Sequence, residues 1–204
     1  MKFVSTVLLI GVLSAACTGS LLTSKNDAPE VFRLQVAQFP PAGEALNATL
    51  SVARPRAASS LDTNRIAVVN QKLGFDYYAG VRWADPSPQM LQQMLVQALS
   101  ADGGFSTVVV APSRVPADLL LEVELRRFEA RTQGQGVPPY VTVEMQAVLI
   151  DLRDGDRLRS FPAYGQATAS ASRRAAVIAA FDEATNAAIA TVVTGLRAVD
   201  SAKM

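Results

Sequence analysis

The sequence predicts an α+β fold: a two-layer α/β sandwich in which two main helices pack on a mostly antiparallel sheet. Three observations support this prediction. Segments 117–131 and 140–152 alternate apolar and polar residues, as strands do when one face is buried and the other is wet. Segments 87–100 and 172–198 instead place apolar residues three or four positions apart, as amphipathic helices do. Strands, helix, strands and helix follow one another along the chain, an order typical of the α+β class.

The composition indicates one folded domain behind a processed N-terminus. Of the 204 residues, 50% are hydrophobic and 18% are charged, which favours a globular body over a disordered one. Residues 1–16 are expected to form a signal peptide, residues 17–30 a lipidated cysteine with a flexible tether, and residues 31–200 the domain. A body of about 185 residues is large enough to bury a proper core.

The first half of the domain is expected to contain short strands and then a helix. Turn-forming residues QFPPAGEA separate the first two strands, and the loop 54–64 precedes the third. Ser87 is predicted to cap the following helix, with Pro88 as its first residue, and Gly103-Gly104 is predicted to end it. The strands expected here are 31–37, 46–53, 65–71 and 75–83, and the apolar face of the helix comprises Met90, Leu91, Met94, Leu95, Ala98 and Leu99.

The second half is expected to hold long strands closed by a long helix. Segment 105–112 is predicted to be a strand, and the loop 132–139 is predicted to join the two alternating strands as a hairpin. Asp154-Gly155 is typical of a second hairpin turn, after which 158–170 returns as a strand. Ser172 is predicted to cap the last helix, whose apolar stripe comprises Val177, Phe181, Ala184, Ala188, Val192, Leu196 and Val199.

The N-terminus has the three parts of a secretory signal. Lys2 is followed by an apolar stretch at 3–13 and by small residues that end at Cys17. The stretch LSAAC resembles a bacterial lipobox, a motif whose cysteine receives a diacylglycerol and then a further acyl chain such as palmitate. The alternative is an ordinary signal peptide cut near Ala16, which leaves Cys17 as a free thiol.

Lipidation at Cys17 would fix the protein to a membrane, because two or three acyl chains give stable anchoring. Ser14 departs from the lipobox pattern, in which a leucine is usual at that position. Thr18 follows the cysteine where an aspartate would favour the inner membrane, by resemblance to the sorting rules of enteric bacteria. The sequence therefore predicts a bacterial lipoprotein on the periplasmic face of the outer membrane.

Charge and missing residue types exclude several classes of function. Without residues 1–16 the chain has 18 basic and 18 acidic side chains, so nucleic acid is not an expected partner. There is no histidine and only one cysteine, which excludes histidine-dependent catalytic triads and an internal disulfide. Glycine-rich phosphate loops and the nucleophile elbow are also absent from the sequence. We therefore expect no catalytic residue, no metal and no cofactor besides the covalent lipid.

Two groups of carboxylates leave alternatives open. Glu122 and Glu124 are expected on one face of a strand, roughly 7 Å apart, a separation at which paired carboxylates can hydrolyse glycosides. Two arginines follow directly, which favours a polar sheet face instead. Asp151, Asp154 and Asp156 are expected at a solvated hairpin tip, with weak calcium binding as the alternative.

Aromatic residues and arginines supply the candidates for an interface. The aromatic residues of segment 75–83 either pack in the core beside the first helix or lie against a partner, since Tyr, Trp and Arg are enriched at interfaces. Arg54, Arg56 and Arg65 similarly either pair with Asp62 or dock on an acidic rim. The interface candidates are Arg54, Arg65, Tyr77, Tyr78, Arg82 and Trp83.

Four motifs follow one another along the chain: LDTNRI at 61–66, YYAGVRW at 77–83, LRRF at 125–128 and AFDEA at 180–184. Together with the lipobox they resemble the ABC-type transport auxiliary lipoprotein family, which includes the paraquat-inducible protein C lipoproteins. The resemblance covers roughly residues 30–195.

This resemblance implies a non-catalytic lipoprotein that serves an ABC system carrying phospholipids or other apolar molecules across the envelope. The implied partners are a substrate-binding protein of the mammalian-cell-entry type and the permease and ATPase of the same system. A ring of several copies is also implied. The alternatives are a periplasmic carrier that binds an apolar ligand between the sheet and the long helix, and a carbohydrate-acting enzyme that uses Glu122 and Glu124.

Overall fold

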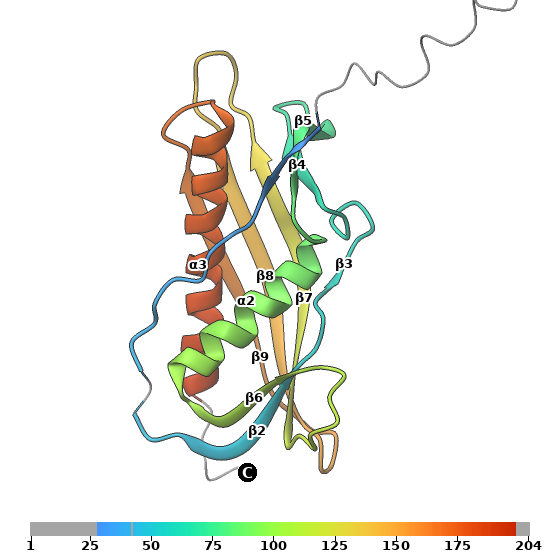
Figure 1. Cartoon of the computed structure of the whole chain (residues 1–204), viewed down its shortest axis with the longest axis vertical. Helices are drawn as coiled ribbons and strands as arrows, with labels where there is room; N and C mark the ends of the chain where they lie inside the picture. Colours follow the sequence, from blue (N-terminus) through green and yellow to red (C-terminus); the bar gives the residue numbers. More distant parts are fainter. Residues whose placement is uncertain (1–27, 42, 199–204) are drawn as a thin grey trace, which may run out of the picture.

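The computed structural model describes residues 28–41 and 43–198. The predictions for the signal peptide, for Cys17 and for most of the tether lie outside the described residues, as does Val199 of the predicted helix stripe. The described residues form one mixed sheet of nine strands with two helices on one of its faces (Figure 1), which confirms the α+β sandwich.

The elements follow the predicted order of strands, helix, strands and helix. The strands are β1 (Glu30–Phe32), β2 (Leu46–Val52), β3 (Arg56–Ala57), β4 (Arg65–Val69), β5 (Phe75–Trp83), β6 (Phe105–Val110), β7 (Leu119–Arg131), β8 (Tyr140–Asp151) and β9 (Arg157–Thr168). The helices are α2 (Ser87–Asp102) and α3 (Arg174–Arg197).

The three longest strands, β7, β8 and β9, form an antiparallel meander at the centre of the fold. The other edge of β7 pairs in succession with β2, β3 and β4, because residues 50–69 run beside β7 in the same direction. β6 extends the sheet beyond β2, while β5 and β1 extend it beyond β4. The long ladders are antiparallel as predicted, but five of the eight pairings are parallel, so the sheet is mixed.

The first predicted strand is shorter than the sequence suggests, and residues 33–41 leave the sheet to cross α3 (Figure 1). Side chains of α3 satisfy the backbone there in place of a neighbouring strand. The amide of Gln35 donates to Asp182 at 2.7 Å, and the amide of Ala37 donates to Asn186 at 2.8 Å. Asn186 in turn donates to the Gln35 carbonyl at 2.8 Å. An apolar pattern alone could not distinguish this strap from a strand.

Both helices begin differently from the prediction. Pro86 occupies the N-cap position of α2, and Ser87 lies inside the helix, where its hydroxyl donates to the Thr63 carbonyl at 3.3 Å. Arg173 rather than Ser172 precedes α3, in an extended conformation and without a side-chain cap. The predicted end of α2 is confirmed, since Gly103 adopts the left-handed conformation with φ 68°.

The helix layer packs directly on the sheet. The predicted apolar faces of α2 and α3 are buried, and they meet the inward residues of β7 and β8. At Gly165 of β9, an added Cβ would collide with the carbonyl oxygen of Ala184 in α3, so the backbones of strand and helix are in contact there. α3 is the one helix in the described part of the chain that is long and apolar enough to cross a bilayer, but core helices of this kind pass the same test, and more than half of its apolar stretch is buried here.

The long strands run along the long axis of the molecule, so the loops gather at two ends (Figure 1). The upper end comprises loops 70–74, 132–139 and 169–173, which adjoin because β4, β7, β8 and β9 end or begin there. The lower end comprises loop 111–118 and the hairpin 152–156, which a hydrogen bond from Leu152 to Asp118 joins at 2.9 Å. The two ends therefore present different chain segments to the surroundings.

Candidate interaction surface around strands β4 and β5

The six interface candidates do not share one environment. Arg54, Arg65 and Arg82 are exposed, and Tyr77 and Tyr78 are half-buried. Trp83 is fully buried. The candidates therefore divide into a surface group around β4 and β5 and one residue of the core.

Trp83 packs against two other aromatic residues, and an interface role for it is wrong. Its ring centroid lies 5.7 Å from that of Phe128 in β7 and 5.1 Å from that of Phe181 in α3, and those two rings are 5.1 Å apart. Aromatic contacts at such distances contribute about 1 kcal/mol each beyond burial. The triangle joins β5, β7 and α3. The indole Nε1 of Trp83 has no hydrogen-bond partner among the described residues.

The loop before β4 fastens the surface group to the rest of the fold. Leu61 is buried, and the carboxylate of Asp62 accepts hydrogen bonds from both terminal guanidinium nitrogens of Arg54, at 2.6 and 3.0 Å. The carbonyl of Thr63 accepts from the Ser87 amide at 3.1 Å, and that of Asn64 accepts from the Trp83 amide at 2.7 Å. LDTNRI therefore acts as a clasp between β4, the end of β5 and the start of α2.

Hydrogen bonding between Arg54 and Asp62 shifts the pKa values of both side chains. The fork from Arg54 lowers the pKa of the Asp62 carboxyl below its usual 3.8 and raises the pKa of the guanidinium. The local pairing that the sequence allowed for Arg54 is thus present. Burial raises the pKa of Tyr78 above its usual 10, so this hydroxyl stays neutral.

Arg65, Tyr77 and Arg82 form the exposed part of the surface group. The guanidinium of Arg65 lies 3.7 Å above the centroid of the Tyr77 ring. The Tyr77 hydroxyl donates to the Ser60 carbonyl at 3.0 Å, which fixes the ring. Arg82 stands directly opposite Arg65 in the β4–β5 ladder, and no ion pair of Arg82 occurs within the described residues. Like charges in facing positions destabilise a sheet, so this pair suits an anionic partner.

The carboxylates on the wet face of the sheet are each held by an arginine. Glu122 pairs with Arg56 at 3.6 Å, and Glu124 pairs with Arg126 at 3.1 Å. These ion pairs oppose the glycosidase alternative, because a catalytic pair needs one carboxyl that stays protonated.

At the 151–156 turn, Asp151 is buried and accepts from the Arg153 guanidinium at 2.9 Å. Hydrogen bonds from the Arg153 side chain and backbone lower the pKa of Asp151 to about 2. The turn thus satisfies its own carboxylates: Asp154 accepts the Asp156 amide at 2.9 Å. Within residues 28–41 and 43–198, no group of three His, Cys, Asp or Glu side chains could hold a metal ion.

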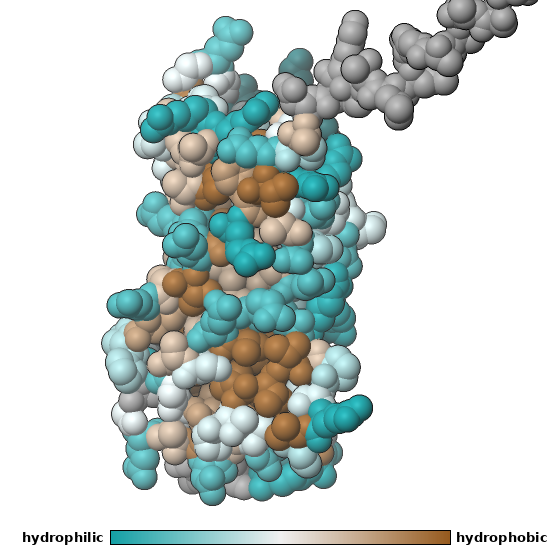
Figure 2. All heavy atoms as spheres, viewed as in Figure 1, coloured by the Kyte–Doolittle hydropathy of each residue, from teal (hydrophilic) through white to brown (hydrophobic). Residues whose placement is uncertain are grey.

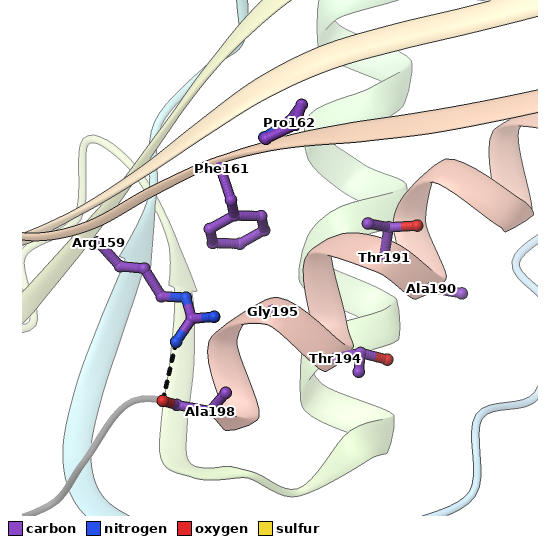
Figure 3. Close-up of a pocket in the computed structure, with 8 residues that line it drawn as sticks. All are labelled: Arg159, Phe161, Pro162, Ala190, Thr191, Thr194, Gly195 and Ala198. Atoms are coloured by element: carbon purple, nitrogen blue, oxygen red, sulfur yellow. Dashed lines mark hydrogen bonds between the residues drawn. The ribbon is translucent and has the colours of Figure 1, made fainter.

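A groove of about 530 Å³ lies between β9 and the last turns of α3 (Figure 3). Phe161 points from β9 towards Gly195, where an added Cβ would strike the ring. Arg159 donates to the Ala198 carbonyl at 2.9 Å and closes one end. The lining residues are Arg159, Phe161, Pro162, Ala190, Thr191, Thr194, Gly195 and Ala198. This groove was not predicted from the sequence, in which its only sign is the threonines and the glycine on the exposed side of an alanine-rich helix.

A second apolar area lies over α2 and β6 (Figure 2). Val96 of α2 and Val108 of β6 are only partly buried, and so are Val109 and Val110 at the end of β6. Among the described strands β6 pairs only with β2, so its outer edge is open. An open strand edge with valines is suited to accept a further strand.

Comparison with known proteins places this fold. The sequence model of the ABC-type transport auxiliary lipoprotein component matches residues 32–193, most of the chain.

The chain belongs to this family.

The resemblance inferred from four motifs is thereby confirmed, and the structure shows what the motifs do. Trp83, Phe128 and Phe181 come from three of them and meet in the aromatic triangle, while Ile66 of the fourth is fully buried. The family motifs thus mark the core that joins the helix layer to the sheet.

Two solved structures and one further relative resemble this chain. The crystal structure of protein XCC0632 from Xanthomonas campestris superimposes with a TM-score of 0.76 at 28% identity, covering 85% of this chain and 99% of that one. A crystal structure titled only as an uncharacterized protein has a TM-score of 0.66 at 17% identity, covering 83% and 99%, which shows the fold alone. Uncharacterized protein bll6063 of Bradyrhizobium diazoefficiens is 29% identical over 150 residues, or 71% of this chain, and the chain spans only 38% of that relative.

Proposed function

We propose that this protein is the non-catalytic, membrane-anchored auxiliary component of an ABC system that moves phospholipids or other apolar molecules across the bacterial envelope. The observation that carries the proposal is the family match over residues 32–193. The LSAAC stretch supports a lipid on Cys17, with residues 1–16 removed, 17–30 as tether and 31–200 as the domain. The outer membrane, on its periplasmic face, is the proposed location.

The proposed partners are a substrate-binding protein of the mammalian-cell-entry type and the permease and ATPase of the same system. Arg65, Tyr77 and Arg82 supply an exposed cationic and aromatic surface for such a partner. Tyr and Arg are over-represented among residues that dominate binding energy. The clasp holds this surface rigidly on the core, which reduces the entropy lost on binding. The open edge of β6 supports contact between copies in a ring.

Purification from cell envelopes in mild detergent, with crosslinking and mass spectrometry, tests the proposal. The full-length protein should carry an acylated Cys17 and recover transport components of the family system. A Cys17→Ser variant is the matched control, because it cannot take the lipid, and it should recover far less partner, since anchoring raises the effective concentration. Recovery of the acylated protein without any transport component would contradict the proposal.

The groove beside α3 favours a second candidate, a carrier that itself binds an apolar molecule. Its volume of about 530 Å³ lies within the range of ligand sites. The space between sheet and helix that a carrier was expected to use is closed where Gly165 meets Ala184. Lipid extraction from purified protein tests the candidate: a stoichiometric lipid that a bulky Thr194→Trp substitution removes would support it, and its absence would contradict it.

A further inference from the structure

We propose that the upper end of the domain rests directly on the bilayer that holds the lipid of Cys17, with Leu73, Phe75 and Val137 in contact with the membrane interface. This inference rests on the proposed function in one respect, the lipid on Cys17.

Three large apolar side chains project from this end. Leu73 is 73% exposed, Val137 is 45% exposed and Phe75 is 43% exposed. Leu73 lies at the tip of the β4–β5 hairpin and Val137 in the β7–β8 loop, where polar residues are usual. Such exposed apolar side chains bury little surface within the domain and therefore stabilise the fold little.

Leu73 adds a backbone cost to this exposure. It is the only non-glycine residue of the described chain with a positive φ, at 62°. That conformation is strained for a leucine, whereas asparagine or glycine adopts it readily. Asn70 enforces it: its side chain accepts from the amides of Lys72 and Gly74, both at 2.9 Å, and its carbonyl accepts from the Leu73 amide at 3.0 Å. Strain held by a built turn, with an exposed side chain at its apex, points to a contact outside the domain.

The two loops form one surface. The side chain of Gln71 donates to the Gln133 carbonyl, and the amide of Thr132 donates to the Val69 carbonyl at 3.0 Å. The apolar side chains of both loops are therefore presented together.

Charge distinguishes this end from the other. Lys72 and Arg173 are the charged residues of loops 70–74, 132–139 and 169–173, and no acid accompanies them there. The nearest acid along the hairpin, Asp76, accepts from the Tyr77 amide at 2.7 Å. The lower end also exposes apolar tips, Val115 at 49% and Leu152 at 46%. Its loops mix both signs of charge, with Asp118, Asp154 and Asp156 beside Arg114 and Arg153. Apolar tips on loops whose own charges are cationic suit an anionic phospholipid surface.

The course of the chain brings the same end towards the anchor. β1 runs parallel to β5, with Glu30 beside Val81 and Phe32 beside Trp83. β5 begins at the hairpin tip, so the chain before β1 comes from the upper end, where the described part starts (Figure 1). Eleven residue steps separate Cys17 from Ala28, which span at most about 38 Å when fully extended. The anchor therefore holds the upper end closer to the membrane than the lower end.

A depth measurement in vesicles tests the proposal. Cys17 is the only cysteine, and acylation occupies it, so an added cysteine is a unique labelling site. The full-length acylated protein carries a polarity-sensitive fluorophore through Leu73→Cys, with Leu152→Cys as the matched control at the lower end. It is reconstituted into vesicles of phosphatidylethanolamine and phosphatidylglycerol, with and without spin-labelled acyl chains. We expect a blue shift and quenching at least several-fold stronger at 73 than at 152.

Equal and weak quenching at both positions would overturn the proposal, as would a shift at 73 that requires an added transport protein. A protein that lacks acyl chains by mass spectrometry would instead contradict the lipid on Cys17, so the two failures are distinguishable. Val137→Cys repeats the measurement without touching the strained turn, and it should respond as Leu73→Cys does.

Discussion

The upper and lower ends of the domain both expose apolar side chains, but they differ in charge and in how their turns are made. At the upper end, Asn70 holds a strained leucine among cations. At the lower end, the 151–156 hairpin satisfies its own carboxylates, and Asp151 is locked by Arg153. The upper end holds Leu73 exposed in a strained conformation, whereas in the lower hairpin Asp151 and Asp154 accept hydrogen bonds from within the hairpin. The difference indicates that the two ends face different surroundings.

Disrupting the contact between β9 and α3, which lies between the two ends, should have the largest effect on stability. Gly165→Ala would force α3 away from β9, because the new Cβ would meet the Ala184 carbonyl. We expect a loss of about 3 kcal/mol in the free energy of unfolding, measured by chemical denaturation, with both ends affected alike. Gly43→Ala is the control, since nothing lies within 4 Å of the added Cβ. An equal stability of the two variants would refute close contact of strand and helix.

Disrupting the ion pair that joins the two helices near the lower end should have the next largest effect on stability. Arg197 of α3 donates to Asp102 at 2.8 Å, and Asp102 is buried at the end of α2. Arg197→Met would leave that carboxylate buried without its cation, so we expect a loss of about 2 kcal/mol, below the range for fully buried pairs because Arg197 is partly exposed. Arg159→Met, which removes a bond to the Ala198 carbonyl, should cost less than about 1 kcal/mol. A thermal melt that ranks the two variants the other way would contradict this.

The lower hairpin should make the protein sensitive to acid. The pKa of Asp151 is about 2 in the folded protein against an ordinary 3.8, so its contribution to stability is complete above about pH 4 and is lost as the pH falls through about 2. The stability difference between the wild type and Asp151→Asn should therefore shrink over that interval. Unfolding curves collected across it test this, and a difference that is constant with pH would count against the Asp151–Arg153 bond.

The smallest effect should run in the opposite direction. Leu73→Asn relieves the positive φ and should stabilise the domain by about 1 kcal/mol, although it removes an apolar side chain. Leu152→Asn should leave stability unchanged within about 0.5 kcal/mol. In vesicles, the Leu73 variant should lose membrane contact at position 137. A destabilised Leu73→Asn would show that Leu73 serves the fold itself.

Much of this structure could be predicted from local pattern. Leu119 to Leu125 alternate because one side of β7 is buried in the core and the other is more exposed, and the stripe of α3 repeats because one side of the helix is buried. The strap at 33–41 could not be predicted, because its backbone partners are side chains of α3 that lie about 150 positions away.

The candidate surface was predictable in composition but not in orientation. Gly80 has φ 70°, and the β4–β5 register shifts between Arg65 and Ala67. This irregularity breaks the alternation of β5. The two-residue periodicity of a strand therefore cannot show that Trp83 is buried while Tyr77 lies nearer the surface. The motif residues gave the family correctly, although several of them, including Trp83, Phe128 and Phe181, serve the core.

Crosslinking from a single site tests the central claim, service to an ABC transport system, most directly. A photoreactive phenylalanine analogue is placed at Arg82 in the full-length protein in cells, with Tyr164 on β9 as the exposed control site. We expect a crosslink from position 82 to the substrate-binding protein or permease of such a system, and a much weaker one from position 164. Crosslinks from position 82 to lipid or to other copies alone, with no transport component, would contradict it.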